Sequence, residues 1–210
     1  MPLEKIVLDH GRAWALWRIL ESEEALAAQN PWDILSPTVT NPQKRREWLA
    51  GRVLVKHIMH ELGLPFSGIT KDEFGKPFLK GYSFHLSLSH SFPYVAALLD
   101  KSQSAGIDLE QPKEKLLKIA PRVLHVDEAA DAGADIIKHC IYWCAKEALV
   151  KVHGKKDLTF AKNLMVSSFS MKDEGDLLGR IIVDDREQVV PLYYMRYPNF
   201  VLVFSKRSTS

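Results

Sequence analysis

The stretch Tyr94–Glu110, YVAALLDKSQSAGIDLE, decides the predicted fold, because two apolar segments in it flank the polar turn Asp100–Ser104. Both apolar segments are typical of short strands. Helices followed by strands are expected on each side of this stretch, with the helices at residues 22–29, 42–62, 114–124 and 135–153. We therefore predict an α+β protein with two similar α/β halves, residues 1–104 and 105–210.

The composition narrows the class of protein. The 210 residues include 28 basic and 26 acidic side chains, a formal charge of +2, which gives no global reason to expect nucleic-acid binding. Cys140 and Cys144 lie four residues apart on one expected helix, which argues against a disulfide framework or a four-ligand zinc site. The sequence has no apolar run of membrane-spanning length and no signal-peptide pattern, so we expect a cytoplasmic protein that contacts neither membrane nor nucleic acid.

The segment Gly106–Glu110 carries two carboxylates at alternate positions of an expected strand. Alternation sends the side chains of Asp108 and Glu110 to one face of the strand. Two carboxylates placed in this way are able to share a hard cation such as Mg²⁺, whereas leaving them unpaired costs electrostatic free energy. The same pattern also fits an acidic, solvated strand end.

A second group of residues recurs every four positions on the expected helix 135–153. Trp143, Glu147 and Lys151 share one face of that helix. Glu147 would complete a three-carboxylate magnesium site, and Lys151 would contact an oxygen of the same phosphate. The alternative is a surface pair of Glu and Lys beside a core tryptophan, worth only about 0.3–0.5 kcal/mol.

Two segments nearer the N-terminus suit contact with phosphate. In the turn Gly75-Lys76-Pro77, glycine lets the backbone approach a ligand and Lys76 supplies a positive charge. Ser89 and His90, at the end of an expected strand, are able to donate hydrogen bonds to anionic oxygens. Taken singly, these features are also common in turns and solvated loops.

The order of the four motifs resembles the 4′-phosphopantetheinyl transferase superfamily: GKP (75–77), SLSHS (87–91), GIDLE (106–110) and WCAKEALVK (143–151). The length and the two-half layout resemble its larger, pseudo-dimeric type, which activates surfactin synthetase and other carrier-protein systems. The resemblance extends from about Arg45 to Gly154. It implies two halves packed with pseudo-two-fold symmetry, an active site at their interface and a monomeric protein.

The resemblance also implies an activity, namely transfer of the 4′-phosphopantetheine arm of coenzyme A to a serine of an apo acyl or peptidyl carrier protein. Adenosine 3′,5′-bisphosphate would be the leaving group. Mg²⁺ would be held by Asp108, Glu110 and Glu147, with Lys151 on the phosphate under attack, and either Glu147 or a metal-bound water would take the serine proton. The residues implied in coenzyme A binding by the N-terminal half are Arg46, with Arg45 and Arg52 as substitutes, Lys76, Pro77, Ser89 and His90.

The expected helix 114–124 and the residues just before it offer a docking surface for an acidic carrier protein. This surface combines basic with apolar side chains: Lys113, Lys115, Lys118 and Arg122 with Leu116, Leu117 and Ile119. An amphipathic helix packed on its own core explains the same pattern. Two other functions stay open on the residues alone: a coenzyme A-binding module without catalysis, and another magnesium-dependent phosphoryl-transfer enzyme.

Overall fold

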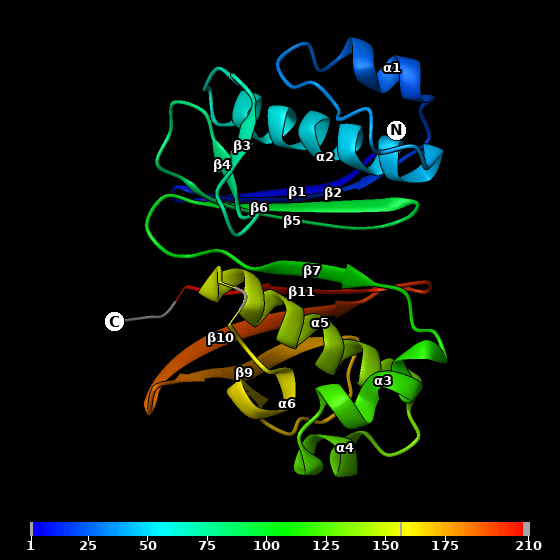
Figure 1. Ribbon diagram of the computed structural model, residues 1–210, viewed down its shortest axis with the longest axis vertical. Coiled ribbons are helices and arrows are strands. Elements are labelled where there is room, and N and C mark those ends of the chain that lie inside the picture. Colours follow the sequence, from blue (N-terminus) through cyan, green and yellow to red (C-terminus); the bar gives the residue numbers. More distant parts are fainter. Residues whose placement is uncertain (1, 156, 208–210) are drawn as a thin grey trace. The chain divides into compact units, whose positions relative to one another are not determined.

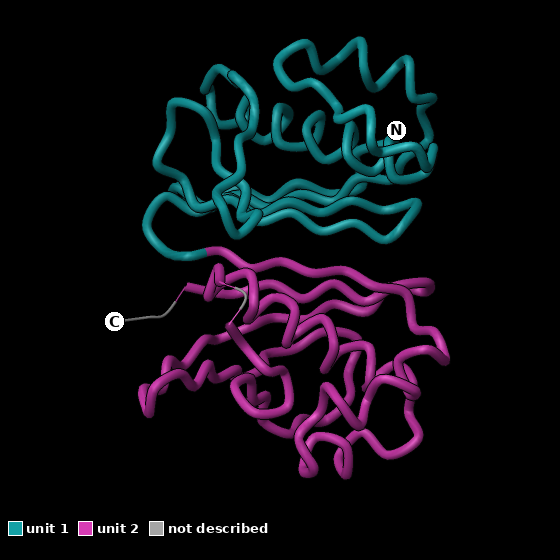
Figure 2. The backbone as a smooth tube through the Cα atoms, viewed as in Figure 1, with its two compact units in different colours: residues 1–104 teal, residues 105–210 magenta. Residues whose placement is uncertain are grey.

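The computed structural model describes residues 2–155 and 157–207. The chain divides into two compact units, residues 1–104 and residues 105–210 (Figure 2). Each unit combines one antiparallel sheet with one long helix that packs on it. The predicted α+β class with two similar α/β halves is confirmed.

The first unit contains a six-stranded sheet in the order β1-β2-β6-β5-β4-β3, in which every neighbouring pair is antiparallel. Its elements are β1 (Leu3–Asp9), β2 (Arg12–Arg18), α1 (Glu23–Ala28), α2 (Pro42–Glu61), β3 (Ile69–Lys71), β4 (Pro77–Leu79), β5 (His85–Ser91) and β6 (Tyr94–Asp100). Helix α2 lies across one face of this sheet (Figure 1).

Helix α2 starts where the sequence predicts it. The side chain of Asn41 accepts hydrogen bonds from the backbone N–H groups of Gln43 and Lys44, and Pro42 occupies the first helical turn. The apolar face of the helix, including Val53 and Ile58, is buried in one core with strands β2 and β6. Burial of this face orients the first two turns of α2, which carry Arg46 and Glu47.

The second unit contains a five-stranded antiparallel sheet in the order β7-β11-β10-β9-β8. Its elements are β7 (Ile107–Glu110), α3 (Lys115–Val123), α4 (Val126–Ala132), α5 (Ile136–His153), α6 (Phe160–Asn163), β8 (Leu164–Val166), β9 (Glu174–Val183), β10 (Arg186–Arg196) and β11 (Val201–Ser205). Helix α5 packs on the sheet of this unit (Figure 1).

Helix α5 approaches strand β7 closely at Gly106. A Cβ atom on Gly106 would collide with the backbone carbonyl of Ala148 and would lie 2.9 Å from Val152 Cγ2. Only glycine therefore allows the backbones of helix and strand to come this near. The close approach places the last two turns of α5 beside the start of β7.

Strand β1 and helix α4 were not predicted. Strand β1 is an edge strand with mostly exposed side chains, so it lacks the apolar alternation that marks a half-buried strand. Helix α4 has only seven residues and begins at His125, an unusual N-cap whose ring accepts from the N–H of Asp127. No helix formed by residues 2–155 and 157–207 is both long enough and apolar enough to span a membrane.

Candidate active site

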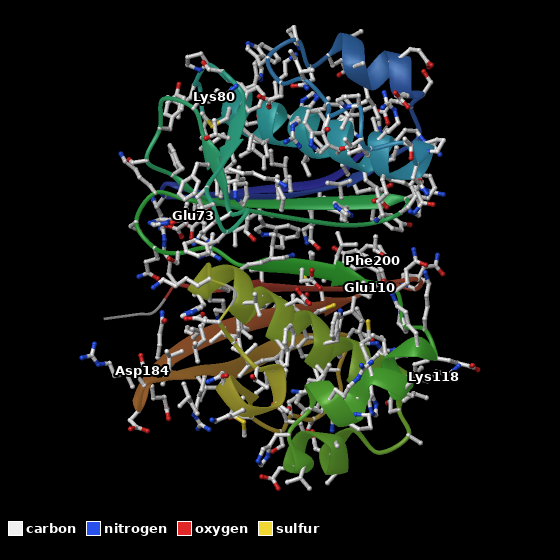
Figure 3. The ribbon with its side chains drawn as sticks, in the orientation of Figure 1. Glu73, Lys80, Glu110, Lys118, Asp184 and Phe200 are labelled. Carbon is white, nitrogen blue, oxygen red and sulfur yellow. The ribbon has the colours of Figure 1, made fainter. Side chains whose placement is uncertain are left out.

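Strand β7 presents the acidic pair at one end of the second unit's sheet. Pairing with β11 sets Asp108 opposite Val203 and Glu110 opposite Val201. The side chain of Asp108 is buried, and that of Glu110 is half-buried. Because alternate residues share one face of a strand, the two carboxylates lie on the same side of β7 (Glu110 is labelled in Figure 3).

Lys151 joins helix α5 to this strand. Its Nζ donates to Oδ1 of Asp108 over 2.8 Å and to the backbone carbonyl of Ile107 over 2.7 Å. The Lys151 side chain is 26% exposed, whereas that of Asp108 is 9% exposed. The ammonium group therefore balances one buried carboxylate and remains partly open to solvent.

Glu147 lies one helical turn before Lys151 and belongs to the same electrostatic cluster. Burial, together with the negative charges of Asp108 and Glu110, raises the pKa of Glu147 to about 7, and Lys151 opposes this shift. The structure thus brings together the four residues predicted from the acidic strand and the helix. We use the term acidic cluster for Asp108, Glu110 and Glu147.

The three carboxylates of the acidic cluster are candidate ligands of a metal ion. Among residues 2–155 and 157–207, no three His, Cys, Asp or Glu side chains lie close enough to ligate one ion as they stand. Asp108 accepts from Lys151 at this site, and Glu110 accepts from the N–H of Gln111 over 2.9 Å and from Lys115 Nζ over 3.3 Å. The donor chemistry nevertheless fits a hard cation, because Mg²⁺ prefers carboxylate oxygens and the charges of Asp108 and Glu110, after burial, contribute to the raised pKa of Glu147.

Lys146, the neighbour of Glu147 in the same motif, faces the interior. Its side chain is fully buried, and its Nζ lies 2.6 Å from Oε2 of Glu128, which is also buried. The same Nζ donates to the backbone carbonyls of Val123 and Phe160. Lys146 therefore fastens α5 to α3, α4 and α6 and has a structural role.

The GKP segment forms the turn between β3 and β4. Asp72 Oδ1 accepts from the backbone N–H groups of Phe74 and Lys76, and Gly75 has φ +88°, a conformation that favours glycine. Burial lowers the pKa of Lys76, and Asp72 opposes this effect. Pro77 begins β4, so the turn fixes the position of both GKP residues that were predicted to bind coenzyme A.

Ser89 and His90 do not point the same way. They are consecutive residues of β5, so their side chains project to opposite faces of the sheet. His90 lies on the α2 face, where its Nδ1 is 3.1 Å from Oε2 of Glu47. Ser89 is buried on the other face. In this unit the two residues that were predicted to contact phosphate are separated by the strand itself.

The three candidate arginines of α2 have different surroundings. Arg46 is half-buried, with its Cζ 4.8 Å from the centroid of the Phe92 ring. Arg45 pairs with Glu23, its Nη2 lying 2.6 Å from Oε1. Arg46 thus differs from Arg45 and Arg52, whose guanidinium groups lie beside the carboxylates of Glu23 and Asp33.

Arg52 is held inside the first unit. Its side chain is buried, its Cζ lies 3.3 Å from the Trp48 ring centroid, and its Nε lies 3.4 Å from Asp33 Oδ2. Burial lowers the pKa of Arg52 to about 10, and Asp33 opposes the shift. These contacts fit a structural role of Arg52 in fixing the loop before α2.

Glu47 is a residue of this region that sequence reasoning missed. It is buried on α2 and contacts His90, Lys44, Gln43 and the backbone N–H of Phe92. A signal was present in the sequence, because an acidic residue interrupts the apolar stripe directly after a run of basic residues.

The expected docking surface lies on α3 and the residues before it. Of its apolar residues, Leu117 is exposed whereas Leu116 is buried. Its basic residues are all exposed: Lys113, Lys115, Lys118 and Arg122. Lys118 extends from α3 in Figure 3. Lys115 differs from the others because it pairs with Glu110 of the acidic cluster.

Taken together, the fold and the acidic cluster with Lys151 define an α+β protein suited to chemistry at phosphate groups. A family model described as the 4′-phosphopantetheinyl transferase superfamily matches residues 104–190, which include the whole cluster. The chain belongs to the 4′-phosphopantetheinyl transferase superfamily.

Several transferases of this superfamily are similar to the chain. It is 37% identical over 119 residues to the 4′-phosphopantetheinyl transferase psf-1 of Bacillus pumilus, which covers 52% of this chain and 51% of psf-1. It is 30% identical over 145 residues to the transferase AcpT of Escherichia coli K12, covering 62% of this chain and 72% of AcpT. It is 29% identical over 160 residues to the transferase Sfp of Bacillus subtilis, covering 71% of this chain and 67% of Sfp. The match therefore spans about half the length of psf-1 and about two thirds or more of the other two.

Proposed function

We propose that this protein transfers the 4′-phosphopantetheine group of coenzyme A to a serine of an apo acyl or peptidyl carrier protein. The observation that carries the proposal is the contact between Lys151 and Asp108 within the acidic cluster, in the segment matched by the family model. A cationic side chain beside carboxylates is the arrangement that phosphoryl transfer requires for positioning and for charge stabilisation.

In the proposed reaction the serine Oγ forms a bond to the β-phosphorus of coenzyme A. The bond from that phosphorus to the bridging oxygen breaks, and adenosine 3′,5′-bisphosphate leaves with this oxygen. Glu147, a carboxylate in the same electrostatic cluster as Lys151, accepts the serine proton. Lys151 donates a hydrogen bond to a phosphate oxygen on which charge develops.

Asp108, Glu110 and Glu147 are the residues that would hold Mg²⁺. When bound, the metal neutralises charge on the phosphate oxygens of coenzyme A. Lys151, which balances Asp108, would donate to a phosphate oxygen of the substrate.

The coenzyme A nucleotide would contact residues of the first unit. Arg46, Lys76 and His90 are the proposed charged contacts, and Pro77 and Ser89 are kept as proposed neutral ones. Arg52 is kept as an indirect contributor, because its contacts with Trp48 and Asp33 fix the helix that carries Arg46. An acidic carrier protein would dock on α3 through Lys118 and Arg122.

We further propose a monomer that works in the cytoplasm. Both Cys140 and Cys144 are free thiols, which agrees with a reducing compartment. The oligomeric state is checked by light scattering during size-exclusion chromatography of the full chain. A mass of one chain in the presence and absence of coenzyme A supports the proposal.

Intact-mass spectrometry tests the activity. An apo carrier protein is incubated with the full chain, coenzyme A and Mg²⁺, and the Glu147→Ala variant is run in parallel. A gain equal to one phosphopantetheine group, lost with the variant or with a chelator, supports the transferase and its metal dependence. Binding of coenzyme A without a mass gain on several acyl and peptidyl carriers would support a non-catalytic binding module instead.

A further inference from the structure

A buried carboxylate, Glu47, lies at the junction of helix α2 with the end of strand β5. Its side chain is 1% exposed, although it carries a charge and lies in the first unit's outer layer. A buried carboxylate is costly unless it is paired and hydrogen-bonded. The identity of its partners therefore indicates what the carboxylate is for.

The partners of Glu47 come from three segments of the chain. Oε2 lies 2.7 Å from Lys44 Nζ and 3.1 Å from His90 Nδ1, and Oε1 accepts from Gln43 Nε2 and from the backbone N–H of Phe92, both over 3.2 Å. Glu47 thus connects the first turn of α2, the end of β5 and the turn that follows β5.

The contact with His90 determines how its imidazole can act. A carboxylate only accepts hydrogen bonds, so Nδ1 must carry a proton where it meets Glu47. The ring is then fixed with Nε2 as its remaining polar atom, and the His90 side chain is 45% exposed. A proton on Nε2 makes the ring a cation held between Glu47 and an incoming anion.

Arg46 lies next to Glu47 and completes the same corner of the unit. Its guanidinium is above the Phe92 ring, and the Phe92 backbone is bound by Glu47. Through Phe92 and His90, one buried carboxylate therefore orders two basic side chains that the resemblance assigns to coenzyme A. Lys44, which is 54% exposed, is held by the same carboxylate.

We infer that Glu47 is a positioning residue for the binding of a phosphate group of coenzyme A, acting through the orientation of the His90 imidazole. The inference rests on the proposed function for the identity of the ligand. It makes Glu47 part of the binding machinery although its carboxylate is repelled by phosphate and does not contact it. A residue that only fastened α2 to the sheet would affect stability and leave affinity for coenzyme A unchanged.

Calorimetric titration of the full chain with coenzyme A tests the inference. Four proteins are compared: the wild type, Glu47→Gln, His90→Ala and the double variant. We expect Glu47→Gln to weaken binding about tenfold, as outer partners of functional histidines typically do, and to change the rate at saturating coenzyme A by less than about twofold. In the His90→Ala background the Glu47→Gln change should have little further effect, because both act through one imidazole.

Glu61→Gln is the matched control. Glu61 is an exposed residue at the end of the same helix and lies 3.5 Å from His60 Nδ1, so it forms the same kind of pair in solvent. This variant should bind coenzyme A as the wild type does. Wild-type affinity in folded Glu47→Gln, or equal weakening in both His90 backgrounds, overturns the inference.

A measurement on the wild type guards against a variant that does not fold. Long-range ¹H–¹⁵N correlation spectra should show Nδ1 of His90 protonated and hydrogen-bonded. An unprotonated Nδ1 overturns the inference without any variant. If the wild-type chain shows this imidazole but binds no coenzyme A, the assigned ligand and the proposed function are overturned. That outcome differs from failure of the Glu47–His90 coupling alone, in which the wild type still binds coenzyme A.

Discussion

The ammonium of Lys151 and the carboxylate of Asp108 lie 2.8 Å apart and connect helix α5 with strand β7. The same ammonium also reaches the carbonyl of Ile107, so one side chain bonds to both the backbone and the side chain of the strand. A residue that the sequence indicated as a phosphate contact thus also helps to fix the strand that carries the acidic cluster.

Replacement of Lys151 by Met should reduce both activity and stability. Loss of the cation should lower the transfer rate by about 10²-fold or more, since preorganised charge at the phosphate is lost. The buried Asp108 carboxylate loses the hydrogen bond from Lys151, which should lower the free energy of unfolding by about 1–3 kcal/mol. Carrier mass spectrometry and urea unfolding measure the two effects.

The exposed Lys162 provides the control for that substitution. Lys162→Met removes a lysine from α6, outside the acidic cluster, and should leave both quantities near the wild-type values. If Lys151→Met kept wild-type transfer rates, the role of Lys151 at the phosphate would be refuted, whatever its stability.

Gly106→Ala should destabilise the second unit. The added Cβ would overlap the Ala148 carbonyl, and a backbone atom cannot move aside as a flexible side chain can. We expect a loss of at least about 2 kcal/mol in the free energy of unfolding, measured by urea titration.

Gly51→Ala is the matched substitution in helix α2. A Cβ at Gly51 would meet Val95 and Leu88 at 3.7 and 3.8 Å, which are ordinary van der Waals distances. This variant should be as stable as the wild type or more stable by up to about 1 kcal/mol, because alanine favours the helix interior. Equal destabilisation by both substitutions would contradict the close approach at Gly106.

The parts of this arrangement that depend on local sequence patterns were predictable from the sequence. The apolar period predicted α2 and α5 with nearly correct ends, and the structure shows Asn41 and Asp135 as their N-caps. Strand alternation correctly placed Asp108 and Glu110 on one face of β7.

What the sequence did not reveal were contacts between segments far apart in the chain. The pairing of Lys146 with Glu128 and that of His90 with Glu47 join residues 18 and 43 positions apart. Neither pair leaves a periodic pattern in the sequence, because each depends on how helices pack on other elements. The separation of Ser89 from His90 was predictable from strand alternation once β5 was known to extend to Ser91.

The contribution of Glu47 to the free energy of unfolding should depend on pH. Burial alone would raise the pKa of Glu47, but the hydrogen bonds and charges of His90 and Lys44 lower it from 4.5 to about 2. A carboxylate with a lowered pKa in the folded state contributes its full stability above pH 4.5 and loses it as the pH falls towards 2.

Urea unfolding of the wild type and of Glu47→Gln at several pH values measures this contribution. The wild type should be more stable at pH 7, by up to roughly 3 kcal/mol, and the difference should shrink between pH 4.5 and pH 2. Glu61→Gln should show no such narrowing. A difference that stays constant down to pH 2 would rule out the lowered pKa.

Two lysines of the docking surface should behave differently. Lys118→Glu should raise the KM for an acidic carrier protein several-fold and leave the Kd for coenzyme A unchanged, because Lys118 is exposed on α3. Lys115→Glu should also disturb coenzyme A turnover, since it would place a like charge beside Glu110. Steady-state kinetics with varied carrier, together with coenzyme A titrations, separate the two cases. Unchanged carrier KM for Lys118→Glu would remove α3 as the docking surface.

Helix α5 is constrained on two sides, by Gly106 at the strand and by Lys146 at the smaller helices. A helix held in this way has little freedom to rotate about its axis or to slide along it. The backbone positions of Glu147 and Lys151 are therefore fixed beside strand β7, and only their side chains are free to turn.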